Sequence, residues 1–74
     1  MSVEKCVRNL TGFEGVFDEK ANLNIYGLDS LRRVELVICL EEEFDINFSD
    51  GDLTQSNFET IDSINKLLRE YGKI

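Results

Sequence analysis

Histidine is absent from all 74 residues of the chain, and cysteine occurs only at positions 6 and 39. Without histidine, neither a Ser-His-Asp triad nor a zinc site with histidine ligands can be built. The two cysteines are too far apart in sequence to form a metal-cluster motif. Glu41, Glu42 and Glu43 are expected on the outside of a helix, in water, where nothing would separate their pKa values for acid–base catalysis. With no glycine-rich phosphate loop either, the composition argues against an enzyme.

Long apolar runs are missing as well. No stretch approaches the length of a membrane-spanning helix, and Met1 is followed by Glu4 and Lys5 instead of the apolar core of a signal peptide. We therefore expect a cytoplasmic protein. Cys6 and Cys39 each lie in an apolar periodic stretch, so both are expected to be small core residues in a reducing compartment, not the halves of a disulfide.

Basic residues are scarce, because 8 lysines and arginines stand against 15 aspartates and glutamates, which gives a net charge of −7. Between Asp29 and Asp62 there are ten acidic residues and only two basic ones, Arg32 and Arg33. Such a surface repels nucleic-acid phosphates and anionic lipids, so we expect no nucleic-acid partner and no membrane insertion. It would attract basic patches on other proteins, although an ordinary solvated acidic surface would show the same imbalance.

A calcium loop is imitated by Asp45, Asn47 and Ser49, but the imitation is incomplete. The sixth position of the loop is Asp50 where glycine is needed, and the twelfth is Ser56 where a bidentate glutamate is needed. The sequence therefore does not predict a calcium sensor.

The length allows one domain, which we place at residues 1–74, and a small helical bundle is the simplest way to bury a core at this size. Hydrophobic periodicity predicts an all-α fold of three main helices plus one short helix. The first helix is expected to follow Ser2 as its N-cap and to end at Gly12, with four apolar residues at helical spacing: Val3, Cys6, Val7 and Leu10. Residues 12–29 then form a loop whose large apolar side chains should pack onto the core: Phe13, Val16, Phe17, Leu23, Ile25 and Leu28.

The next helix carries two apolar stripes and can be capped by either Asp29 or Ser30. The first stripe follows an i, i+4, i+8 pattern with one flanking valine: Leu36, Leu40, Phe44 and Val37. The second stripe is turned well away from the first: Leu31, Val34 and Ile38. Because one stripe is enough to face the core, the second is expected to be free for a partner.

Two further elements complete the predicted bundle. The segment 46–58 is expected to contain one short helical turn, capped by Ser49 or Asp50 and anchored by Leu53. Thr60 caps the last helix and Gly72 ends it. The apolar face of that helix comprises Ile61, Ile64, Leu67, Leu68 and Tyr71.

Ser30 stands at the start of the main helix, where its hydroxyl could simply accept a hydrogen bond from the backbone, worth about 1 kcal/mol. Asp29 can cap the helix alone, however, which leaves the hydroxyl available. A helix N-terminus carries about half a positive charge, which suits a phosphate ester. The second stripe lies immediately beyond, bordered by Glu35, Glu41 and Glu42. A modified serine, an apolar strip and a rim of carboxylates would together form a docking surface for a basic partner.

The run GLDSLRRVELVICLEEEF, residues 27–44, closely resembles the phosphopantetheine attachment region of acyl carrier proteins, and DLTQSNFETIDSINKLL, residues 52–68, resembles their third and fourth helices. The resemblance covers residues 23–68. It implies that a phosphopantetheinyl transferase attaches 4′-phosphopantetheine to Ser30, that Asp29 helps to hold the transferase's magnesium, and that acyl cargo rides on the arm as a thioester. Six residues of the main helix match positions that partner enzymes recognise in the family: Leu31, Val34, Glu35, Ile38, Glu41 and Glu42. We add Arg32 to the expected partner surface, and we expect a monomer.

Three features depart from the family pattern. Only 29 residues precede Ser30, several fewer than in fatty-acid carriers, which puts in doubt whether the bundle encloses its cargo. Arg32 and Arg33 place positive charge next to the arm. Proline, usual before the short third helix, is absent, and Ser49 takes its place.

These departures favour a specialised pathway, polyketide or related, over housekeeping fatty-acid synthesis. The short chain leads us to expect a free-standing carrier, with a domain excised from a larger synthase as the alternative. Its expected partners are acyltransferases, ketosynthases, or adenylating and ligase enzymes with basic docking patches. A peptidyl or aminoacyl carrier of a nonribosomal-peptide or aminoacyl-transfer pathway is the alternative. An acidic helical adaptor without a prosthetic group is a more distant one.

Overall fold

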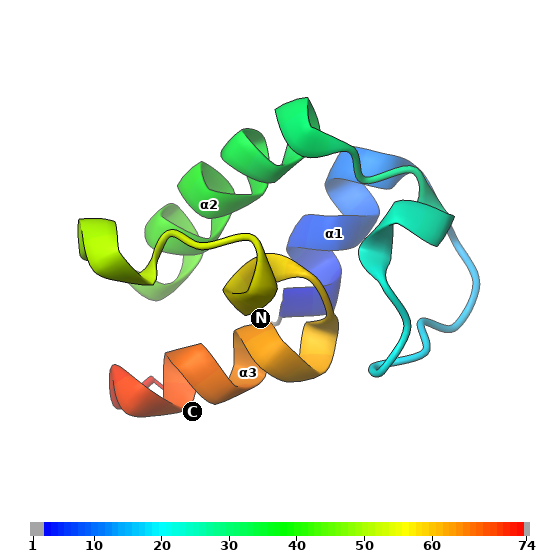
Figure 1. Ribbon diagram of the computed structural model, residues 1–74. Coiled ribbons are helices and arrows are strands. Elements are labelled where there is room, and N and C mark those ends of the chain that lie inside the picture. Colours follow the sequence, from blue (N-terminus) through cyan, green and yellow to red (C-terminus); the bar gives the residue numbers. More distant parts are fainter. Residues whose placement is uncertain (1–2, 74) are drawn as a thin grey trace.

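Three α-helices form the framework of the protein, which we describe from a computed structural model over residues 3–73. They are α1 (Val3–Thr11), α2 (Ser30–Phe44) and α3 (Ile61–Glu70). Helix α1 packs against both α2 and α3 (Figure 1). The described residues contain no strand, so the all-α prediction is confirmed. The short elements are three 3-10 helices: η1 (Leu23–Tyr26), η2 (Asp50–Asp52) and η3 (Ser56–Phe58).

Helix α1 contributes Val3, Cys6 and Val7 to the core and ends where the sequence predicts. Gly12 follows the helix with φ 73°, a left-handed conformation that favours glycine, and its N–H donates to the Arg8 carbonyl. Ser2, the expected N-cap, lies outside the described residues.

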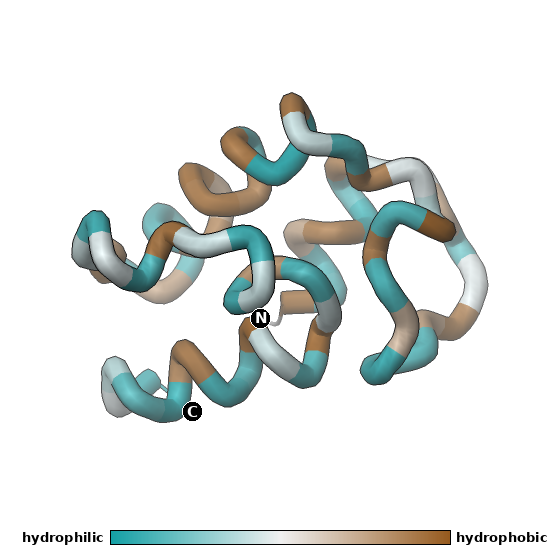
Figure 2. Tube along the Cα trace, viewed as in Figure 1, coloured by the Kyte–Doolittle hydropathy of each residue, from teal (hydrophilic) through white to brown (hydrophobic). Residues whose placement is uncertain are grey.

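Helix α2 has the two faces that its apolar stripes predict. Leu36 and Leu40 are fully buried, and Val37 and Phe44 are partly buried against the same core. Leu31, Val34 and Ile38 are 75%, 60% and 52% exposed. Figure 2 shows hydrophobic residues, in brown, recurring along most of this helix. Asp45 ends the helix in a left-handed conformation, and its N–H donates to the Glu41 carbonyl.

In the loop between α1 and α2, only some of the large apolar side chains pack onto the core. Phe17, Leu23 and Leu28 are buried, and Phe13 is partly buried. The expectation is wrong for Val16 and Ile25, which are 91% and 68% exposed. The reason is geometric, because inward-facing aromatic rings of Phe13, Phe17 and Tyr26 pack on one another with centroids 4.7–5.1 Å apart and fill the space under the loop.

The segment between α2 and α3 contains two 3-10 turns where one short helix was predicted. Leu53, the expected anchor, is 44% exposed, whereas Phe48 and Phe58 are buried with their rings edge to face at 5.3 Å. The Ser49 hydroxyl makes no capping hydrogen bond and donates instead to the Asp52 carboxylate. Tyr71 closes this corner by donating to the same Asp52 carboxylate at 2.7 Å.

Two glutamates of α2 hold neighbouring segments, contrary to the expectation that Glu41 and Glu43 lie free in water. The Glu41 carboxylate accepts a hydrogen bond from the Phe48 N–H at 2.9 Å. Glu43 pairs with Lys5 of α1 at 3.6 Å. Phe48 has already left the helix and would otherwise have an unpaired N–H at a partly buried position, which explains why Glu41 turns toward it.

Helix α3 begins at a reciprocal cap, which confirms the role predicted for Thr60. The Thr60 hydroxyl accepts from the Ser63 N–H, and the Ser63 hydroxyl accepts from the Thr60 N–H. Ile61, Ile64, Leu67 and Leu68 are buried, and the helix ends just before Gly72, whose φ is 74°.

The two cysteines are core residues with free thiols, as expected. Cys6 on α1 is fully buried and Cys39 on α2 is half-buried. Burial, a hydrogen bond with Cys39 and the nearby charge of Glu43 raise the pKa of the Cys6 thiol to about 12. The Cys6 thiol is therefore neutral, and a poor nucleophile, at any physiological pH.

The stability of the fold should depend on the inner face of α2 and not on its outer face. Truncation of Leu40 to alanine leaves a cavity in the core and should lower the free energy of unfolding by about 2–5 kcal/mol. Truncation of Ile38 should cost less than about 1 kcal/mol, because much of this side chain is already in water. Urea titration of Leu40→Ala and Ile38→Ala measures both values, and equal losses would contradict the assignment of the two faces.

Stability should also fall at alkaline pH through Cys6. An unfolded cysteine loses its proton near its usual pKa of about 8.5, whereas folded Cys6 keeps its proton. The stability that the neutral thiol contributes is therefore fully present below about pH 8.5 and is lost as the pH rises toward the folded pKa. Unfolding free energies measured at about pH 8 and about pH 10.5 should drop more for the wild type than for Cys6→Ala. Equal drops would show that Cys6 makes no such contribution.

Candidate functional site

Ser30 is the first residue of α2 and its side chain is exposed. Asp29 is the N-cap, and its carboxylate oxygen Oδ1 accepts a hydrogen bond from the Arg32 N–H at 2.9 Å. The Ser30 hydroxyl makes no hydrogen bond with any residue between 3 and 73. Of the two caps that the sequence allows, the structure thus uses Asp29.

The approach to Ser30 is held by a rigid turn. Asn22 caps η1 by accepting from the Asn24 N–H at 2.9 Å. Gly27 ends η1 with φ 97°, a conformation in which any side chain would be strained. Leu28 then enters the core as a fully buried residue. Because Leu28 is fixed two residues before Ser30, the start of α2 has a defined position on the surface.

A hollow of about 400 Å³ opens beside the serine. It is lined by Ser30 itself and by residues of η1, of α2 and of the turn before η3: Asn24, Gly27, Leu28, Asp29, Arg33 and Gln55.

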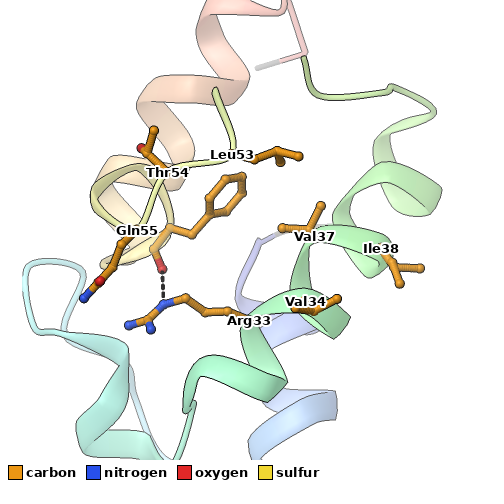
Figure 3. Close-up of a pocket in the computed structure, with 8 residues that line it drawn as sticks. Arg33, Val34, Val37, Ile38, Leu53, Thr54 and Gln55 are labelled. Atoms are coloured by element: carbon orange, nitrogen blue, oxygen red, sulfur yellow. Dashed lines mark hydrogen bonds between the residues drawn. The ribbon is translucent and has the colours of Figure 1, made fainter. Parts of the chain in front are cut away.

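A second, more apolar groove of about 270 Å³ lies farther along α2. Its walls come from α2 and from the segment before α3: Arg33, Val34, Val37, Ile38, Leu53, Thr54, Gln55 and Phe58. Figure 3 shows the valines and Leu53 along the groove, with Arg33 and Gln55 together at one end. Arg33 and Gln55 line both the hollow and the groove.

The residues predicted to meet partners fall into two groups. Leu31, Val34 and Ile38 are exposed, and Glu35 and Glu42 are exposed beside them. Glu41 is set apart, since it is half-buried and bonded to the loop. The acidic rim of this surface therefore consists mainly of Glu35 and Glu42.

The two arginines after Ser30 point to different places. Arg32 is exposed, and its guanidinium donates to the Leu10 carbonyl near the end of α1 at 3.1 Å. Arg33 is half-buried and reaches the opposite side, toward Asn24 and Phe58. Of the two, only Arg33 lines the hollow beside Ser30, whereas the guanidinium of Arg32 is turned toward α1. Their adjacent positions on a helix predict the divergence, but not which of them faces the hollow.

Among residues 3–73, no three histidine, cysteine, aspartate or glutamate side chains come together as a metal site. None of the helices in this part is both long and apolar enough to cross a membrane.

Comparison with known proteins identifies the family. The model of the phosphopantetheine attachment site family matches residues 2–70. The acyl carrier proteins of two strains of Buchnera aphidicola subsp. Acyrthosiphon pisum, Tuc7 and APS, are each 42% identical over 55 residues, which is 72% of this chain and 69% of theirs.

Solved structures show the same fold at lower sequence identity. One is a carrier protein of Bradyrhizobium japonicum bound to its glycine:carrier protein ligase together with an analogue of glycyl adenylate. It has a TM-score of 0.82 and 21% identity, over 92% of this chain and 91% of that one. Another is the glycylated carrier with the same ligase, at a TM-score of 0.77 and 22% identity, over 88% of this chain and 90% of that one. The family match, the relatives and the fold agree with one another, and the chain belongs to the acyl carrier protein family as a non-catalytic carrier that bears phosphopantetheine.

Proposed function

We propose that Ser30 is the residue to which the 4′-phosphopantetheine group of this carrier is attached. The observation that carries the proposal is that the Ser30 hydroxyl is exposed and has no hydrogen-bond partner among residues 3–73, while its neighbour Asp29 caps the helix. The hollow beside Ser30 gives space for the first atoms of the group. The bound group would supply a thiol on a flexible arm, to which cargo is joined as a thioester.

The attachment reaction needs no base from this chain, which is consistent with its lack of histidine. The Ser30 oxygen attacks the phosphorus atom next to the pantetheine of coenzyme A, and a new oxygen–phosphorus bond forms. The diphosphate bond of coenzyme A breaks, its electron pair leaves with the nucleotide half, and the serine proton passes to a base of the transferase. The contribution of this chain is to hold an accessible hydroxyl in a fixed position.

Asp29 can serve the transferase without giving up its role in the fold. One carboxylate oxygen, Oδ1, accepts the Arg32 N–H, and Oδ2 makes no hydrogen bond within residues 3–73. A carboxylate oxygen is a preferred magnesium ligand. Asp29 would therefore supply one ligand to a magnesium ion held mainly by the transferase.

Partner enzymes would dock on the outer face of α2. Its three exposed apolar side chains, Leu31, Val34 and Ile38, lie next to the carboxylates of Glu35 and Glu42. A complementary partner has an apolar pocket with basic residues around it, since charge complementarity speeds association and sets orientation. Candidates are the transferase, acyltransferases, ketosynthases, and adenylating or ligase enzymes. Arg32 lies on the same surface and would disfavour partners that require a wholly acidic helix.

The cargo is proposed to be an acyl group of a polyketide-related or fatty-acid-type pathway. Support comes from the 42%-identical relatives, which are named acyl carrier proteins. Aminoacyl cargo is the second candidate.

Intact-mass analysis tests the attachment site. The apo protein is incubated with coenzyme A, magnesium and a promiscuous phosphopantetheinyl transferase. The wild type should gain the mass of one phosphopantetheine, and Ser30→Ala should gain none. Ser63→Ala is the matched control, because this serine is bonded into the α3 cap, and it should be modified as fully as the wild type. Modification of Ser30→Ala would refute the assignment.

A further inference from the structure

Arg33 joins three parts of the fold around the hollow and the groove. From α2, its Nη2 donates to the Asn24 side chain in η1 at 3.1 Å, and its Nε donates to the Phe58 carbonyl at the end of η3 at 3.5 Å. Figure 3 shows the guanidinium at one end of the apolar groove, next to Gln55. The same guanidinium lines the hollow beside Ser30, so it stands where the two spaces meet.

The charge of Arg33 is not balanced by any carboxylate among residues 3–73. Both of its hydrogen-bond acceptors are neutral, and it forms no ion pair with a described residue. This is notable in a chain with 15 acidic residues and a net charge of −7. Holding a guanidinium half-buried without a carboxylate costs solvation energy. A guanidinium has five N–H groups, so three of them still lack an acceptor among the described residues.

We propose that Arg33 binds an anionic oxygen group that the arm on Ser30 brings to it. This inference rests on the proposed attachment at Ser30. Positions three apart on a helix lie on the same face, so the phosphodiester on Ser30 and the guanidinium of Arg33 belong to one side of α2. Guanidinium groups bind phosphate and carboxylate oxygens through paired, charge-assisted hydrogen bonds, which are stronger than those between neutral groups. The bound arm is thereby held over the junction of hollow and groove.

Two groups on the arm have this chemistry. The phosphodiester is bonded directly to Ser30, and every loaded form of the carrier has it. A carboxylate at the far end of a dicarboxylic acyl group would reach Arg33 only if the arm folds back along α2. The first source predicts a contact in all forms that carry the arm, and the second predicts a contact that depends on the cargo.

The two sources are separated by comparing four forms of the protein: apo, holo, and arms carrying either a monocarboxylic acyl group or a dicarboxylic one of the same length. A promiscuous transferase prepares the last two from the matching coenzyme A thioesters, and intact mass confirms each product. The Arg33 Nε–H signal in nitrogen-15 NMR reports the contact directly. The melting temperature, compared with that of the apo form of the same variant, reports its effect on stability.

If Arg33 binds the phosphodiester, every form that carries the arm should show a shifted Arg33 Nε–H signal and a melting temperature raised by about 4 °C or more. If it binds the cargo carboxylate, only the dicarboxylic form should show these changes. Arg33→Gln should lose the temperature rise and Arg33→Lys should keep part of it, since lysine retains the charge but not the paired donors. Arg32→Gln is the matched control and should retain the rise, because Arg32 reaches toward α1. A rise in the holo form identifies the phosphodiester, and one confined to the dicarboxylic form identifies the carboxylate.

The proposal is overturned if the Arg33 signal is the same in all four forms, or if Arg33→Gln and Arg32→Gln lose the same rise. In those cases the mass spectra still report attachment, so Ser30 keeps its assigned role. If the mass spectra show no attachment at Ser30, both the attachment site and the role of Arg33 are refuted.

Discussion

The hydrogen bond from the Arg32 N–H to the Asp29 carboxylate is the interaction on which the functional geometry depends. It ends the turn that begins at η1 and starts α2 at a fixed residue. Such a cap is worth about 1 kcal/mol, a substantial fraction of the stability of a domain this small. The position of the cap matters more than its energy, because a cap at Asp29 leaves the next hydroxyl, that of Ser30, exposed and without a hydrogen bond to any residue from 3 to 73. The serine is thereby available for chemistry without cost to the fold.

Helix α2 has two apolar faces, of which one is buried in the core and the other is exposed. Leu36 and Leu40 are enclosed by α1 and by the segments that pack over the bundle. Leu31, Val34 and Ile38 stay in water. Burying these side chains against a partner would add hydrophobic stabilisation to the complex, which the fold alone does not gain. Glu41 and Glu43 bond to neighbouring segments, so part of the acidic surface of α2 serves the fold and is not available to the proposed partners.

Local patterns were enough to predict the helices and to single out Ser30 as a candidate for modification. The spacing of apolar residues indicates which face of α2 is buried, and Gly12 and Thr60 mark a helix end and a helix start by their own conformational preferences. These signals act over a few residues, so they are readable without the fold. The family resemblance added the attachment chemistry, which no periodicity contains.

The errors concern contacts between segments that are distant in sequence. Val16 and Leu53 are large and apolar yet exposed, whereas the buried rings of Phe17 and Phe48 contact Tyr26 and Tyr71, which lie 9 and 23 positions away. The hydrogen bond between Arg33 and the Phe58 carbonyl joins residues 25 positions apart. The short motif GLDSLRR does not indicate that Arg33, and not Arg32, makes this bond. A long polar side chain bonds to the groups that lie near it in the folded chain. The contacts of Arg33 with Asn24 and Phe58 can therefore be found only from the structure.

The central claim is that Asp29 holds the start of α2 and Ser30 does not. It is tested most directly by the free energies of unfolding of Asp29→Ala and Ser30→Ala in the apo protein, measured by urea titration. Loss of the cap should lower stability by about 1 kcal/mol. Loss of the serine hydroxyl should change it by no more than about 0.5 kcal/mol. If Ser30→Ala were as destabilising as Asp29→Ala, the hydroxyl would be part of the fold, and the account of a serine left free for modification would be contradicted.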